Sequence, residues 1–398
     1  MLQTLLSLSL IVGLIFGASA PASAENLKQI AGGNNQFALD LYNNMKSKEG
    51  NIFFSPYSIS LAMAMTYGGA RGETAEQMAD VMHFDTDQDK FHRQFNKLMN
   101  FTEKAAGENN NRLEIANRLW GSLTEKFKES YLELTQKYYD AKLETVDFSQ
   151  TEKTRKEINN WVAKQTEDKI KELLKPRDID ASTSMVLTNA IYFLGIWQTQ
   201  FDPKLTKKMP FETPDGEIEV EMMHNKKVEC IYGETENLQL LGIPYEGFKT
   251  AMFIALPRKG IGLKTIEENL SCEAYKQWFK TTNRDKVSLF MPKFKLSYSA
   301  QLQENLQQMG MSLPFSSSAD FTGMSPGRGL YISKVIHQAF VDVNEKGTEA
   351  AAATAVTMAR GMAPKVTTVR IDRPFLFFIV DMDTQNILFM GRMENPDK

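Results

Sequence analysis

The chain has 398 residues, of which 42% are hydrophobic and 24% charged. This composition excludes a disordered, collagen-like or coiled-coil chain, and at roughly 150 residues per domain the length alone predicts two or three domains. The 46 Lys and Arg residues nearly balance the 49 Asp and Glu residues. The resulting net charge of −3 gives no bulk electrostatic ground for binding nucleic acid or an anionic membrane.

The N-terminus has the pattern of a secretory signal peptide. Residues 1–24 carry no charged side chain, and the apolar run from Leu2 to Phe16 is too short to span a bilayer. The small residues Ala22 and Ala24 then form a cleavage site, although only the amino terminus supplies positive charge. The alternative is a buried apolar helix. We therefore predict a signal peptide of residues 1–24 and a secreted, extracellular protein with no membrane span.

Glycosylation sequons and cysteines add little to this prediction. Asn100 and Asn269 each begin an Asn-x-Ser/Thr tripeptide, a pattern that is common by chance. Cys230 and Cys272 either form one bridge or stay as thiols. Two Cys and four His exclude a disulfide framework and a four-Cys zinc site, so we expect no metal and no cofactor.

The first half of the chain is predicted to be mostly helical. Ser55 is a good N-cap and Pro56 suits a first helical turn, so a helix begins there. Its small, apolar body extends to Tyr67 and should be buried, and Gly68 and Gly69 end it. Further helices are predicted over residues 35–45, 75–81 and 151–174.

The second half of the chain favours strands. The continuous apolar run 185–193 suits a strand buried on both faces, and residues 383–386 suit a hairpin turn. Other predicted strands are residues 251–256, 287–291, 366–371, 375–380 and 387–391. Helices followed by strands predict an α+β fold, and no linker long enough to separate two domains is present.

One motif suggests an enzyme, but its chemistry fails. Residues 323–327 match the G-x-S-x-G elbow of hydrolases, with Ser325 as the nucleophile. The residue after the nucleophile must donate its backbone N–H to the oxyanion hole, and Pro326 has none. We therefore predict that the protein is not an enzyme.

Residues 345–364 fit neither a surface helix nor a core helix. From Ala350 to Ala359 no side chain is charged and only Met358 is large. Alanine favours a short surface helix, but such a helix usually carries Lys and Glu, and a core helix carries Leu or Ile on one face. Small uncharged residues can enter a tight slot in a sheet without a clash or a buried charge. The run ends at Arg360-Gly361, a bond that a trypsin-like protease can cut.

Several long stretches, in the correct order, resemble the serpins over residues 28–398. They are residues 51–60, residues 68–74, residues 188–193 with Trp197 and Phe201, residues 341–351, residues 372–377 and residues 389–392. The resemblance implies one serpin domain of residues 25–398, with three β-sheets, about nine helices and an exposed reactive-centre loop at residues 345–368. It also implies a monomer.

In serpins the loop is bait for a protease. The resemblance implies that the protease cleaves the loop and forms an acyl-enzyme, and that the loop then inserts into the central sheet as a new strand. The covalently bound protease is trapped, and the native fold is metastable.

The resemblance also assigns roles to individual residues. The hinge of the loop is Glu345, Gly347, Thr348, Glu349, Ala350, Ala351, Ala352 and Ala353. The shutter, which must open for insertion, is Ser55, Ser58, Asn189 and His337, and Trp197 lies at the breach.

Two counts along the loop disagree about the reactive bond. The usual sixteen residues beyond Glu345 end at Gly361, which makes Gly361–Met362 the bond. Counting back from Arg373 favours Arg360–Gly361, and we favour Arg360 over Gly361, Met358 and Met362.

The predicted function is a secreted suicide-substrate inhibitor of trypsin-like serine proteases. The alternatives are a non-inhibitory carrier or chaperone, which the small-residue hinge disfavours, and a cross-class inhibitor of a cysteine protease. Glycosaminoglycan binding is not expected, because the matching region, residues 90–99, has only Lys90, Arg93 and Lys97 among mixed residues.

Overall fold

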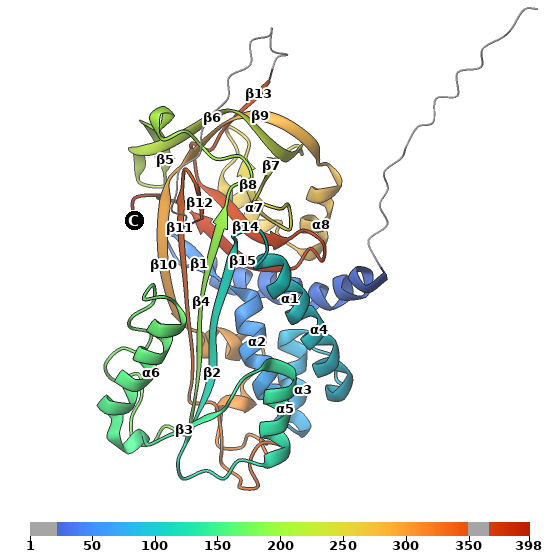
Figure 1. The fold of residues 1–398 in the computed structure, drawn as a ribbon, viewed down its shortest axis with the longest axis vertical. Coiled ribbons are helices and arrows are strands. Elements are labelled where there is room, and N and C mark those ends of the chain that lie inside the picture. Colours follow the sequence, from blue (N-terminus) through green and yellow to red (C-terminus); the bar gives the residue numbers. More distant parts are fainter. Residues whose placement is uncertain (1–21, 349–365) are drawn as a thin grey trace, which may run out of the picture.

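A computed structural model describes residues 22–348 and 366–398, with side chains from Leu27 onward (Figure 1). These ranges contain nine α-helices and a large β structure, which confirms the α+β class and the expected number of helices. The helices are α1 Ala22–Met45, α2 Pro56–Tyr67, α3 Gly72–Met82, α4 Gln88–Ala106, α5 Glu129–Tyr139, α6 Thr151–Gln165, α7 Leu263–Glu268, α8 Cys272–Lys280 and α9 Gln303–Gln308. None of the helices in these ranges has the length and apolar character needed to cross a membrane.

A six-stranded sheet, here called the central sheet, runs along the long axis of the molecule (Figure 1). Its strands are, in spatial order, β10 Phe294–Gln301, β11 Lys334–Asn344, β12 Gly347–Thr348, β4 Met185–Ile196, β2 Arg112–Ser122 and β3 Glu144–Val146. β4 and β11 are parallel, and each is flanked on its other side by an antiparallel strand.

The remaining strands form one nine-stranded sheet. In spatial order they are β1 Ile52–Phe54, β15 Ile387–Met393, β14 Phe375–Asp381, β8 Thr250–Pro257, β7 Leu238–Pro244, β6 Gly216–Glu234, β9 Asn283–Pro292 and β13 Thr367–Arg370, with β5 Lys207–Thr213 paired to β6. The 19-residue β6 pairs with β5 near its start and with β7 near its end. Two of the three sheets that the resemblance implies are therefore joined through β6.

Helix α2 lies at the centre of the fold. Every residue from Pro56 to Tyr67 is buried, because the helix contacts α1, β2, β4 and β15. Ser55 caps it as predicted, since its Oγ accepts a hydrogen bond from the backbone N of Ser58 at 3.1 Å.

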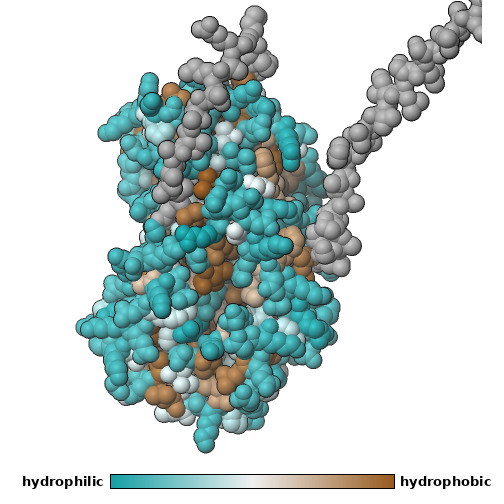
Figure 2. All heavy atoms as spheres, in the orientation of Figure 1, coloured by the Kyte–Doolittle hydropathy of each residue, from teal (hydrophilic) through white to brown (hydrophobic). Residues whose placement is uncertain are grey.

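Two apolar clusters cover the two faces of the central sheet. The larger extends from Phe37 to Met393 and joins helices with both sheets. The smaller places Ile158 and Val162 of α6 against β4 and β11 of the central sheet. The surface of the molecule is mostly hydrophilic on the face that Figure 2 shows.

Helix α6 is shorter than predicted, because it ends at Gln165 and not at residue 174. The Thr166 hydroxyl donates to Val162 O at 2.9 Å and accepts from Ile170 N at 3.2 Å, so it replaces the next helical turn. Asn159 then holds Leu174 through two hydrogen bonds of 2.8 and 2.9 Å. The apolar spacing beyond residue 165 therefore belongs to an irregular segment that packs on the helix.

Candidate functional site

β12 lies between the upper ends of two parallel strands of the central sheet (Figure 1). Thr348 pairs with Val343 of β11 on one side and with Gly195 of β4 on the other. Lower down, β4 and β11 pair directly with each other over seven residue pairs, from Val186–Lys334 to Tyr192–Phe340. The described part of the predicted hinge is therefore already a short strand of this sheet.

Gly347 is a glycine because the strands approach closely there. A Cβ on this residue would lie 1.9 Å from the carbonyl oxygen of Gly195. That separation is far below van der Waals contact, so any larger side chain would push β12 away from β4.

Thr348 is fully buried in an aromatic socket formed by Trp197 and Tyr245. Its hydroxyl and that of Tyr245 share a hydrogen bond of 2.7 Å. The Tyr245 ring stacks on Trp197, with 4.6 Å between the ring centroids and 9° between the planes. Trp197 Nε1 donates to the carbonyl of Asn344 at 3.0 Å, which ties the socket to the end of β11. Burial raises the pKa of Tyr245, so it stays a neutral hydrogen-bonding phenol.

Glu345 anchors the turn that joins β11 to β12. Its carboxylate accepts a hydrogen bond from Thr206 Oγ1 at 2.8 Å and lies 3.3 Å from Lys293 Nζ. Partial burial opposes ionisation, but the bond from Thr206 and the Lys293 ion pair still hold the pKa of Glu345 below its usual value. Glu345 therefore stays ionised at neutral pH.

The four predicted shutter residues, Ser55, Ser58, Asn189 and His337, meet under the middle of the central sheet. Asn189 Nδ2 donates to Ser58 Oγ at 2.7 Å, and the Ser55 backbone N donates to His337 Nε2 at 3.1 Å. His337 Nδ1 forms a further hydrogen bond with Asn189 Oδ1. The structure thus brings together side chains that are up to 282 residues apart in the chain.

Asn117 is a fifth member of this cluster that the sequence analysis missed. It lies on β2 directly opposite Asn189 of β4, which in turn lies opposite His337 of β11. Asn189 Nδ2 donates to Asn117 Oδ1 at 2.6 Å, and Asn117 Nδ2 donates to the Ser58 carbonyl at 3.0 Å. These three residues form a polar row across three neighbouring strands. Asn117 could be identified as a member only once the register of the strands was known.

His337 is a neutral histidine whose tautomer is set by its neighbours. Because Nε2 accepts the Ser55 N–H, the ring proton lies on Nδ1 and is donated to Asn189. Complete burial lowers the pKa of His337 to about 3. Parting β4 from β11 would break the bond between His337 and Asn189.

Part of the predicted site lies outside the described residues. This part comprises Glu349, Ala350, Ala351, Ala352 and Ala353 of the hinge, together with Met358, Arg360, Gly361 and Met362. The chain is described again from Val366, where β13 begins one residue later and pairs in parallel with β9. The reactive bond therefore stays a prediction.

The other candidate residues do not form a reactive site. Ser325 is buried in a loop, and its Oγ lies 3.3 Å from a carboxylate oxygen of Glu125. Cys230 and Cys272 are both free thiols, and burial raises the pKa of Cys230 to about 12. Within residues 22–348 and 366–398, no group of three or more His, Cys, Asp or Glu side chains could hold a metal ion.

Comparisons with known proteins match this architecture. The family model described as "Serpin (serine protease inhibitor)" matches residues 32–396. Leukocyte elastase inhibitor of Sus scrofa is 42% identical over 382 residues, which cover 93% of this chain and 100% of the relative. Serpin B11 of Homo sapiens is 38% identical, with 91% of this chain and 98% of the relative covered. The crystal structure of Serpin48 from the insect Tenebrio molitor has a TM-score of 0.83 at 28% identity, covering 92% of this chain and 98% of that chain.

The predicted localisation is wrong. The relatives are leukocyte elastase inhibitors and serpin B proteins, which are intracellular, and not secreted, extracellular proteins. The run from Leu2 to Phe16 is apolar enough for a signal peptide, but it lacks the flanking Lys or Arg that such a peptide usually carries. The predicted cleavage point after Ala24 falls in the first turn of α1. Asn100 and Asn269 are exposed, but their predicted glycosylation loses its support with the localisation.

Replacing Gly347 with alanine should loosen the hinge. The added Cβ would collide with Gly195 O, so we expect a loss of about 1–3 kcal/mol in stability and faster amide hydrogen exchange in a peptide covering residues 341–348. Gly262→Ala is the matched control, because a Cβ there meets no atom within 4 Å. Unchanged exchange in Gly347→Ala would contradict the tight fit.

His337 should make the fold less stable in acid. Between about pH 3 and its unfolded pKa of about 6.5, the unfolded chain binds a proton that the folded chain excludes. Stability should therefore fall as the pH falls from about 6.5, by at most about 1.4 kcal/mol per pH unit from this residue.

The difference in unfolding free energy between the wild type and His337→Gln, measured at pH 7.5 and pH 5, isolates this effect. His92, with a pKa lowered to about 4, and Glu103, with a pKa raised to about 7, are present in both proteins and cancel. An equal difference at the two pH values would refute the assignment.

Proposed function

Because the chain belongs to the serpin family, we propose that it inhibits trypsin-like serine proteases as a suicide substrate. Serpins are protease inhibitors and not enzymes, and they hold their targets in covalent complexes. The observation that carries the proposal is the seating of β12 between β4 and β11. β12 runs toward the part of the β4–β11 seam in which the two strands pair directly with each other.

The strand directions explain why a cleaved loop would enter the sheet. β12 is antiparallel to both of its neighbours, which are parallel to each other. Continued insertion would replace one parallel ladder with two antiparallel ladders. More backbone groups would then be paired, and antiparallel pairing is slightly the more stable arrangement per residue. Insertion therefore offers a net gain in hydrogen bonding that can drive the trapping step.

The composition of the next residues suits this path. Ala350 to Ala353 and the residues up to Ala359 carry no charge, so their insertion would bury no unpaired ion. Glu349 alternates with inward positions and would face solvent if Thr348 continues to face the socket.

We assign two restraining devices to the uncleaved state. The shutter residues Ser55, Ser58, Asn189 and His337 hold β4 and β11 together, because the His337–Asn189 bond crosses the seam. At the upper end, Trp197 and the Glu345–Lys293 ion pair hold the turn before β12.

We propose Arg360 as the residue that selects the target. Trypsin-like proteases carry an aspartate in the primary specificity pocket, which pairs with arginine. A second candidate is an elastase-type target, favoured by the identity of 42% with a leukocyte elastase inhibitor. Elastase has a small pocket, which would suit cleavage at Gly361–Met362.

A gel assay distinguishes the two targets. We expect trypsin to form a complex with the full chain that survives boiling in SDS, and the released peptide to begin at Gly361. Pancreatic elastase, run in parallel, should form little complex. A complex with elastase and a peptide beginning at Met362 would instead establish the second target.

The variant Arg360→Ala provides the matched control. It should lose the trypsin complex and keep its thermal stability, because only the specificity residue changes. Complete cleavage of the wild type by both enzymes with no stable complex would refute inhibition and favour a carrier or chaperone. A complex with papain alone would indicate a cysteine protease target.

Thr348→Arg should convert the inhibitor into a substrate. Its guanidinium would have to enter the socket in which Thr348 is fully buried against Tyr245, and no acidic group of the socket could pair with it. We expect the number of inhibitor molecules consumed per protease trapped to rise at least tenfold. Thr348→Val, which keeps the shape without the charge, should stay an inhibitor. Normal trapping by Thr348→Arg would overturn the insertion mechanism.

A further inference from the structure

A cavity of about 680 Å³ lies where β6 pairs with the start of β9. Its size is in the range of small-molecule sites. The walls come from β6, the first residues of β9 and β13, and two tight turns. Part of the lining is apolar, namely the side chains of Ile231, Pro244, Phe248, Val366 and Met382.

Phe248 stands out among these lining residues. Its side chain is 42% exposed, and only Leu123 is a more exposed large apolar residue among those described. Its backbone φ of +58° lies in the left-handed region, which is costly for an aromatic residue. The backbone N of Phe248 donates to Tyr245 O at 3.0 Å, so the turn that leads from the aromatic socket fixes this conformation. The fold thus holds an apolar ring at the cavity in spite of both strain and exposure.

Three cationic side chains, Lys227, Arg284 and Lys286, also line the cavity. The Arg284 guanidinium lies 5.7 Å from the centroid of the Phe248 ring. Lys286 Nζ lies 2.7 Å from a carboxylate oxygen of Glu229, and the pKa of Glu229 is lowered mainly by Lys286, with smaller effects from Lys227 and Arg284. Three cations therefore surround one carboxylate.

The balance of charge leaves room for a second anion. The only other acid in the lining is Asp285, so three cations face two carboxylates. Neither Arg284 nor Lys227 has an acidic partner within ion-pair distance in the part of the chain that the structure describes. An anion placed at Arg284 would gain a planar, pre-organised donor beside an apolar ring.

We propose that this cavity binds a small amphipathic carboxylate. Its apolar tail packs against Phe248, Pro244 and Met382, and its carboxylate pairs with Arg284 and Lys227. The proposal is independent of protease inhibition, since none of these residues belongs to the hinge or the shutter.

Isothermal titration of the full-length protein with decanoate, below its micelle concentration, tests the proposal. We expect saturable binding of one decanoate per chain. The neutral analogue 1-decanol, added at its solubility limit as a competitor, should not displace decanoate. Absence of saturable decanoate binding would overturn the proposal.

Three variants locate the site. Arg284→Gln removes the charge and should weaken decanoate binding at least tenfold. Phe248→Gly should weaken it similarly while keeping or raising thermal stability, because glycine accepts the positive φ without strain. Arg328→Gln, an exposed arginine outside the cavity, should bind like the wild type. If Arg284→Gln and Phe248→Gly both bind decanoate as tightly as the wild type, the site lies elsewhere and the proposal is wrong.

Discussion

The pairing of β12 with both β4 and β11 is the constraint on which the rest of the site depends. Two parallel strands that part at one end leave room for one antiparallel strand, and Gly347 and Thr348 occupy the first two places in that gap. The surrounding residues follow from this seating. Gly347 has no side chain because Gly195 is too close, and Thr348 is small and polar because Tyr245 bonds its hydroxyl.

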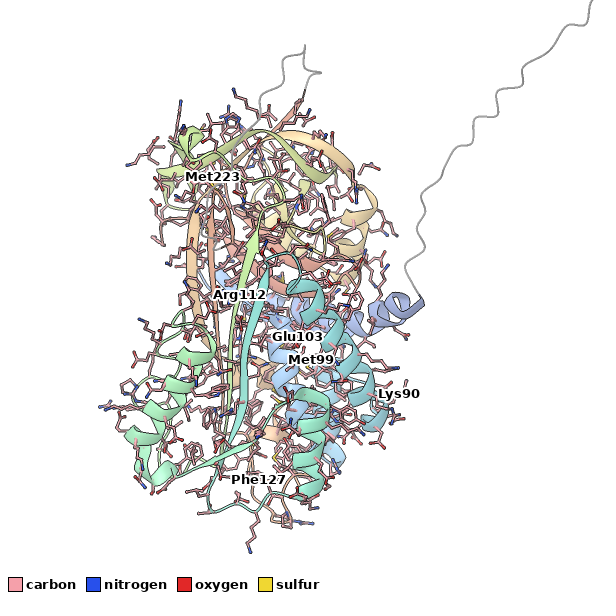
Figure 3. The ribbon with its side chains drawn as sticks, viewed as in Figure 1. Lys90, Met99, Glu103, Arg112, Phe127 and Met223 are labelled. Atoms are coloured by element: carbon pink, nitrogen blue, oxygen red, sulfur yellow. The ribbon has the colours of Figure 1, made fainter. Side chains whose placement is uncertain are left out.

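Two sets of polar contacts restrain β4 and β11, one at the upper end of these strands and one near their middle. Figure 3 shows Met223 of β6 in the upper part of the molecule and Arg112, at the start of β2, nearer its middle. At the upper end, a charged pair, Glu345 with Lys293, holds the turn of the hinge. Further down, the bond across the seam is between neutral groups, because burial keeps His337 unprotonated. The lower contact can therefore break without exposing an ion to the interior.

Local signals predicted the elements and part of the site. Ser55 and Pro56 predicted the start of α2, and the unusual composition after Glu345 predicted a segment suited to a sheet. The sequence alone could not predict contacts that depend on the register between strands. Asn117 bonds with the predicted shutter residues because it lies opposite Asn189, and Tyr245 bonds with Thr348, which lies more than a hundred residues away in the chain. The prediction of localisation failed for another reason, because an apolar N-terminal run without flanking positive charge is weak evidence for a signal peptide.

The parallel β4–β11 ladder has a mechanical consequence. Its seven pairs are closed at one end and already parted at the other by β12. A strand advancing from the parted end meets these pairs one after another, as in peeling, and never loads them all together, as in shear. The resistance at any moment is that of a single pair, except at the fourth pair, where the His337–Asn189 bond adds a side-chain contact to the backbone ladder. The seam therefore opens one residue pair at a time, and its resistance to opening is highest near its middle.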